Sequence, residues 1–199
     1  MIQTLVKNWW LLALCGVLDA GISAIYFLMK GTDGPVLSRS WSGMVVLVRK
    51  LAMAAGVCTV GAAVWRSRNG KNWALGLNGV ALAVLGFVQY GLTRFRISIL
   101  VVAVLVVVMA VSIGVAELGI ARDFRRRRFD ADSWLFGLVG MVSVAVALPS
   151  LAFGLRWIPI EPGSRVDLIW LGCYFAFAGI STIALAVRLR SQRSEGWHC

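Results

Sequence analysis

The chain has 199 residues, of which 59% are apolar and 15% are charged, and its formal net charge is +11. Ordinary soluble domains contain about 45–50% apolar and about 25% charged residues, so this composition excludes a typical soluble protein and indicates a membrane protein. Its basic residues lie in short gaps between apolar runs, which is typical of topology signals, and we expect the lipid bilayer as a partner and no nucleic acid.

Six apolar runs are long enough to cross a bilayer as helices. They cover residues 9–29, 44–65, 73–92, 97–121, 134–154 and 168–189. A helix satisfies its own backbone hydrogen bonds in lipid, and the sequence lacks the alternating segments of a membrane barrel. We therefore predict a single all-α membrane domain, residues 1–199, with six transmembrane helices.

The distribution of Lys and Arg predicts the orientation of these helices. The gaps and chain ends on one side of the predicted membrane hold twelve basic residues, and the gaps on the other side hold six, or eight with Arg49 and Lys50. By the positive-inside rule, we expect both termini in the cytoplasm.

Tryptophan and small residues recur along the apolar runs. Each odd-numbered run begins with a tryptophan followed six residues later by a glycine, and each even-numbered run carries two small residues five apart. Small residues let helix backbones approach closely in lipid, so we expect helix packing at the glycines of this pattern: Gly16, Gly56, Gly61, Gly79, Gly114, Gly119, Gly140 and Gly179. The pattern predicts three copies of one helical hairpin, approximately residues 9–66, 73–122 and 134–190.

The segments "NWWLLALCGVLDAGISAIYFL", "NWALGLNGVALAVLGFVQYGL" and "GVAELGIARDFRRRR" resemble the HdeD-like acid-resistance membrane proteins, a short-repeat family. The resemblance covers roughly residues 9–190 and rests on repeat spacing and helix-packing residues, with no catalytic signature. It implies a multi-pass protein of the bacterial inner membrane that contributes to acid or envelope stress resistance. It implies no particular molecular activity, and it leaves open whether the protein forms a homo-oligomer.

Asp19 departs from the repeat, because Leu82 and Ser143 occupy the same position in the other two copies. It lies roughly 15 Å from either end of the first apolar run, in the middle of a hydrocarbon layer about 30 Å thick. Asp19 either binds a proton or cation in the interior or forms a buried ion pair with Arg49 or Lys50. The alternative for this basic pair is that both side chains extend into the external headgroups.

Two further charged sites are candidates. Glu117 lies about one turn from the end of its apolar run, so we expect an interfacial or interhelical anchor that reaches water, with proton handling as the alternative. The block Arg125, Arg126, Arg127 and Arg128 is interpreted as a cytoplasmic topology anchor that contacts anionic lipids.

The sequence contains no enzyme motif, no metal-ligand spacing among its four cysteines and one histidine, and no signature of a cofactor site. We therefore expect no enzyme, no catalytic residues, no metal and no cofactor. Two functional hypotheses follow: a membrane-embedded stress protein, and a small proton, ion or solute channel or transporter with Asp19 in the pathway.

Overall fold

The computed structural model describes residues 8–31, 39–65, 73–95, 99–126, 130–155 and 165–194. These residues form six α-helices: α2 (Trp9–Gly31), α3 (Arg39–Val64), α4 (Trp73–Phe95), α5 (Ile99–Arg126), α6 (Asp130–Gly154) and α7 (Arg165–Ser194). Each helix contains most or all of one predicted apolar run, and the prediction of an all-helical chain with six helices is confirmed for the described residues. Several helices continue past the apolar runs into charged sequence, which the apolar pattern alone does not predict.

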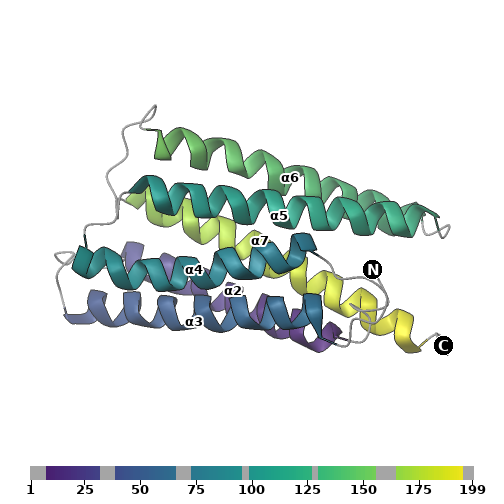
Figure 1. Ribbon diagram of the computed structural model, residues 1–199, viewed down its shortest axis with the longest axis horizontal. Coiled ribbons are helices and arrows are strands. Elements are labelled where there is room, and N and C mark those ends of the chain that lie inside the picture. Colours follow the sequence, from purple (N-terminus) through teal and green to yellow (C-terminus); the bar gives the residue numbers. More distant parts are fainter. Residues whose placement is uncertain are drawn as a thin grey trace.

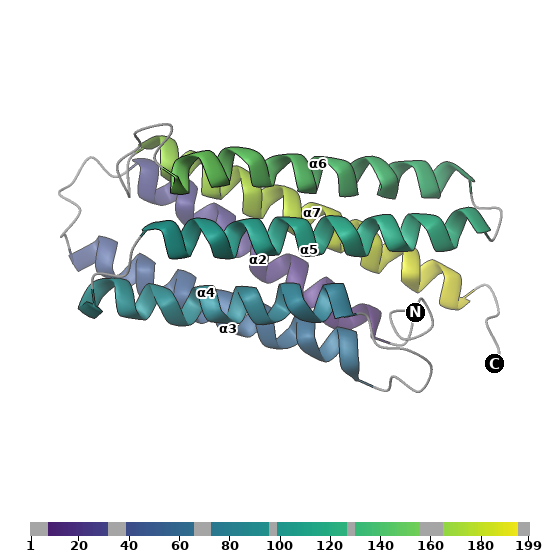
Figure 2. The same ribbon diagram turned by 45° about the horizontal axis from the view of Figure 1, so that its top comes forward.

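The six helices lie side by side in one antiparallel bundle, in which consecutive helices run in opposite directions (Figures 1 and 2). The start of α2 and the end of α7 therefore lie at the same end of the bundle, where the Arg190 guanidinium is 5.2 Å from the ring centroid of Trp9. The most extensive contacts are those of α5 with α6, α2 with α7, and α3 with α4, whereas α6 barely touches α7.

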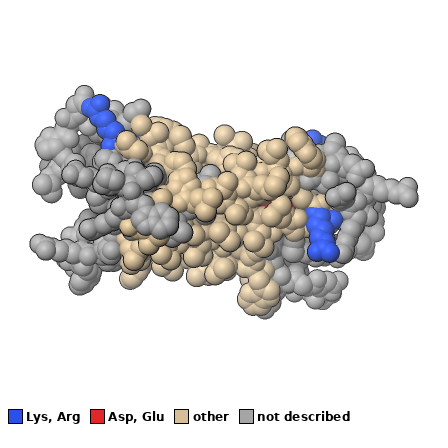
Figure 3. Space-filling view, turned by 90° about the horizontal axis from the view of Figure 1, so that it is seen from above, with Lys and Arg blue, Asp and Glu red and all other residues tan. Residues whose placement is uncertain are grey.

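The outer surface of the bundle is apolar. Four of the described helical segments are long and apolar enough to cross a membrane, namely Trp9–Met29, Gly43–Val64, Ala103–Arg122 and Leu168–Ser191, and the apolar segment Trp73–Val88 is shorter. Large apolar side chains are exposed on every helix, among them Leu28, Val57, Phe87, Val115, Leu148 and Ile180. On the face seen in Figure 3, a belt without described charged side chains separates Lys and Arg side chains near the two ends. The structure is that of a helical membrane protein.

Three glycine pairs hold the most closely packed helices together. Gly16 faces Gly179 between α2 and α7, Gly56 faces Gly79 between α3 and α4, and Gly114 faces Gly140 between α5 and α6. At each of these six positions, an added Cβ would lie within 3.0 Å of a backbone atom of the facing helix. Absence of a side chain therefore permits the close approach, as small residues do in membrane helix packing.

The other two predicted packing glycines are placed differently. A Cβ added at Gly61 would meet only the end of the Leu11 side chain, at an ordinary 3.4 Å, and Gly119 lies half-buried on α5. Gly86, which the repeat pattern does not include, packs closely, because a Cβ there would lie 2.8 Å from the Arg49 carbonyl oxygen.

Two clusters of buried apolar residues fill the interior. The first apolar cluster lies toward the end of the bundle where α3 begins and includes Ile22, Ala55, Leu82, Met109 and Phe175. The second apolar cluster lies toward the opposite end and includes Leu12, Ala62, Leu75, Ile120 and Leu185. Six of the buried polar residues, one from each helix, lie near the level where the two clusters meet.

Candidate functional site: a central polar layer

One buried polar residue from each helix lies near the middle of the bundle. We call this set the central polar layer, and its members are Asp19, Thr59, Asn78, Glu117, Ser143 and Ser181. On α2 to α5 and on α7, the polar residue lies between residues of the first and second apolar clusters in the order of the chain. The apolar clusters therefore separate this layer from both ends of the bundle.

Asp19 is the most poorly satisfied member of the layer. Its side chain is only 4% exposed, and its Oδ1 atom has no hydrogen-bond partner among the described residues. The thiol of Cys15, one helical turn away, donates to its Oδ2 atom at 3.6 Å. Since a thiol is a weak donor, the carboxyl group has little compensation for the water that it lost on burial.

The hydrogen atoms around Asp19 are too few for the contacts that they serve. Thr59 donates from its hydroxyl to the Ala55 carbonyl at 2.8 Å. Cys15 Sγ lies 2.8 Å from the Thr59 hydroxyl oxygen and also contacts Asp19. A thiol and a hydroxyl carry one hydrogen each, so two hydrogens serve three contacts. A proton on the carboxyl group of Asp19 would supply the third, with the thiol then donating to Thr59.

Glu117 connects α5 to α6 and lies close to α7. Its side chain is 4% exposed, and the hydroxyl of Ser143 on α6 donates to its Oε2 atom at 3.2 Å. Ser181 on α7 lies near this carboxyl group, but its hydroxyl donates to the Ala178 carbonyl at 3.0 Å. The interhelical contact matches the expected anchor role, but the expectation that Glu117 reaches water is wrong. The physical reason is that α5 continues for nine residues beyond it, to Arg126, which places Glu117 well inside the bundle.

Two other buried polar atoms near the layer lack hydrogen-bond partners within the described part of the chain. They are the hydroxyl of Tyr174 and Oδ1 of Asn78. Tyr174 is within electrostatic reach of the carboxyl groups of both Asp19 and Glu117, and its ring packs edge-on against Phe175 at 5.3 Å between centroids. Asp19 and Asn78 in the layer, and Tyr174 beside it, therefore have unused hydrogen-bonding capacity, which is unusual for a buried interior.

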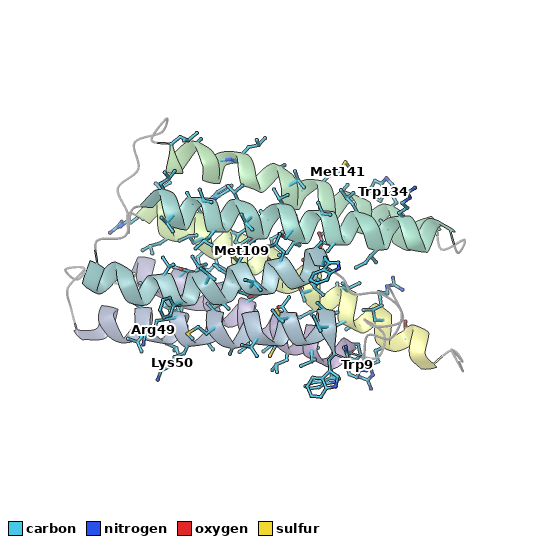
Figure 4. The ribbon with its side chains drawn as sticks, in the orientation of Figure 1. Trp9, Arg49, Lys50, Met109, Trp134 and Met141 are labelled. Atoms are coloured by element: carbon cyan, nitrogen blue, oxygen red, sulfur yellow. The ribbon has the colours of Figure 1, made fainter. Side chains whose placement is uncertain are left out.

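The structure does not bring Asp19 together with the basic pair on α3. Lys50 is exposed and points away from the bundle, and Arg49 next to it is half-buried (Figure 4). The described hydrogen-bond partner of Asp19 is Cys15, and no described cation lies against it. The predicted depths of Asp19 and Lys50 along the membrane are compatible with an ion pair between them. Lys50, however, lies on the outer side of α3.

The arginine block lies at the limit of the described residues. Arg125 and Arg126 form the last positions of α5, and nothing is described of their side chains. Arg127 and Arg128 lie outside the described residues. Contact with anionic lipid at this block stays a prediction.

Hydrogen bonds from two other buried residues tie the helices together, and the sequence did not single out either residue. Asn8, just before α2, donates from its side-chain amide to the carbonyls of Ala62, in the last turn of α3, and of Trp65, just after it. Ser23 on α2 donates to the Gly172 carbonyl on α7 at 2.7 Å. The sequence could have indicated both residues, because each is a polar residue inside or beside an apolar run. Such a residue needs a hydrogen-bond partner in the bilayer.

Comparison of the chain with protein-family models, curated proteins and solved structures gave no match.

Proposed function

We propose that this chain is a bacterial inner-membrane protein that crosses the bilayer six times, has both termini in the cytoplasm and contributes to acid or envelope stress resistance. The resemblance to HdeD-like proteins and the distribution of basic residues support this proposal. An antiparallel bundle of six helices also supports it, because an even number of crossings returns the chain to the side on which it started.

The glycine pairs support three repeated hairpins arranged around an axis along the membrane normal. Gly79 in the second hairpin faces Gly56 in the first, and Gly140 in the third faces Gly114 in the second. The third pair closes the ring, since Gly16 in the first hairpin faces Gly179 in the third. The three glycine pairs thus join neighbouring hairpins in the same way, although α6 barely touches α7 within the third hairpin.

At the molecular level, we propose that the central polar layer binds and releases protons, with Asp19 as the principal group. The observation that carries this proposal is the buried carboxyl group of Asp19. It contacts the Cys15 thiol, the thiol contacts the Thr59 hydroxyl, and this series of contacts lacks one hydrogen. An ionisable residue inside a membrane bundle is a functional candidate because its burial is costly. The proposal includes no catalytic step.

A second candidate is a small proton, ion or solute channel or transporter. This candidate is favoured by the composition of the layer, which takes one polar residue from every helix and therefore surrounds the middle of the bundle. Both apolar clusters would have to part for an ion to pass, so the described conformation corresponds to a closed state of such a pathway.

Proton flux into liposomes distinguishes the two candidates. The purified chain is reconstituted with a pH-sensitive dye inside and an external pH of about 4–5, near the range in which a carboxyl group with its reference pKa titrates. The channel or transporter is supported if the wild-type protein produces proton flux, Asp19→Asn abolishes this flux and Ser23→Ala retains it. If the protein produces no flux, but Asp19→Asn lowers the survival of cells in acid, the results support proton binding without transport. If neither flux nor survival changes in Asp19→Asn, Asp19 has no role.

The topology is tested separately. A reporter that is active only in the periplasm, fused to the C-terminus, should be inactive, and activity of this fusion would contradict the proposed orientation.

A further inference from the structure

An apolar groove of about 370 Å³ lies on the outer surface where α3 and α4 cross. Its lining includes Gly56, Val57 and Val60 on α3 and Val80, Ala83 and Phe87 on α4. The groove follows from the glycine pair, because Gly56 and Gly79 bring the two backbones together while larger side chains project on either side. Val57 and Phe87 are 68% and 66% exposed, so the groove opens toward the lipid.

A basic side chain lies two helical turns from this groove on the same side of α3. Lys50 precedes Val57 by seven residues, which places the two side chains one above the other, about 10 Å apart along the axis. Lys50 is exposed and points away from the bundle, and Arg49 lies beside it (Figure 4). Phe87 extends the groove toward the depth of Lys50, because the neighbouring residue Gly86 packs against the carbonyl of Arg49.

We propose that this face of α3 and α4 binds one phospholipid with an anionic headgroup. The phosphate lies at the ammonium group of Lys50, in the leaflet at the end of the bundle where α3 begins, and one acyl chain occupies the groove. Charge complementarity selects the headgroup, because the positive charge of Lys50 attracts anionic lipid. The long Lys side chain can place its ammonium group at headgroup level while its methylene groups cover apolar surface.

The basic residue distinguishes this crossing from the other two glycine pairs. Lys50 lies six residues before Gly56, whereas Val108 lies six residues before Gly114 and Cys173 lies six residues before Gly179. We therefore expect one selective lipid for each chain. This site lies toward the opposite end of the bundle from Arg125 and Arg126 at the end of α5, so it is separate from the lipid contact predicted for the arginine block.

Native mass spectrometry of the full chain in detergent tests the proposal. The protein is titrated with phosphatidylglycerol or with phosphatidylcholine carrying the same acyl chains, and the fraction with one bound lipid is measured. Lys50→Gln should weaken binding of phosphatidylglycerol about fivefold, the factor expected for one basic residue near a membrane surface, and Lys50→Arg should retain it. Arg122→Gln removes an exposed charge at the other end of the bundle and should have no effect.

Two matched substitutions test the groove. Val80→Trp fills it from the lipid side, and Met141→Trp adds the same ring at the position that follows Gly140 in the α5–α6 crossing (Figure 4). Val80→Trp should reduce lipid binding, and Met141→Trp should not. Equal binding of the two lipids, wild-type affinity in Lys50→Gln, or equal effects of the two tryptophans would each overturn the proposal.

Discussion

Replacement of Gly56 by alanine tests whether direct backbone contact determines the α3–α4 crossing. The added Cβ would lie 2.6 Å from both the Ala83 nitrogen and the Gly79 carbonyl oxygen. Neither atom belongs to a flexible side chain, and ordinary contact begins at 3.4 Å, so the helices must separate locally by about 0.8 Å. Overpacking of this kind typically destabilises by about 1–3 kcal/mol.

Alanine also raises helix propensity by about 1 kcal/mol relative to glycine, which opposes the effect of the clash. Gly61→Ala on the same helix provides the control, because its Cβ would meet only Leu11 at 3.4 Å. The difference between the two variants removes the propensity contribution, and we expect Gly56→Ala to be less stable than Gly61→Ala by about 1–3 kcal/mol.

The assay is equilibrium unfolding in mixed detergent micelles, followed by far-ultraviolet circular dichroism. If the unfolding free energies of Gly56→Ala and Gly61→Ala agree within about 0.5 kcal/mol, the helices are not in the close contact described, and the reasoning is refuted.

Three other predictions concern buried groups. Asn8→Ala should lower the unfolding free energy by about 1–2 kcal/mol, because the carbonyls of Ala62 and Trp65 lose a donor. Asn8→Asp should lower it at least as much, because its side chain has no N–H group. In a double-mutant cycle, Ser143→Ala and Glu117→Leu should show a coupling of at least about 0.5 kcal/mol in unfolding free energy, and strict additivity would contradict their hydrogen bond. In single-cysteine variants, a lipid-soluble maleimide should label exposed Cys173 before buried Cys15, and equal labelling rates measured by mass spectrometry would contradict the described packing.

Helix positions were predictable from the sequence because a membrane helix needs a long apolar run, and each run coincides closely with one helix. Six of the eight glycines in the predicted repeat also indicated where helices pack closely, whereas Gly61 does not lie at such a contact. The pairing of α2 with α7 was not predictable, because hydropathy and small residues identify a packing face without identifying its partner.

The candidate site was predictable only in part. Asp19 was recognisable as the charged residue in the middle of an apolar run, and the structure places it in the interior. An ion pair with Lys50 was one of the alternatives for Asp19, and it is not found among the described residues. Counting residues gives depth along the membrane and not the direction in which α3 faces. The uncharged members of the layer, such as Asn78 and Ser181, were missed because a single amide or hydroxyl hardly changes the hydropathy of a run.

The contact between α2 and α7 has a consequence for biosynthesis. Ser23 and Gly172, which join these helices, are 149 residues apart in the chain. At about 5–20 residues per second, the ribosome needs roughly 7–30 s to make the intervening sequence. During that time the first helix resides in the membrane without its principal neighbour, and Gly16 and Asp19 face lipid, the insertion machinery or a chaperone. Assembly of the ring therefore waits for the last helix, and truncation before α7 should leave the first helix recognisable to membrane quality control.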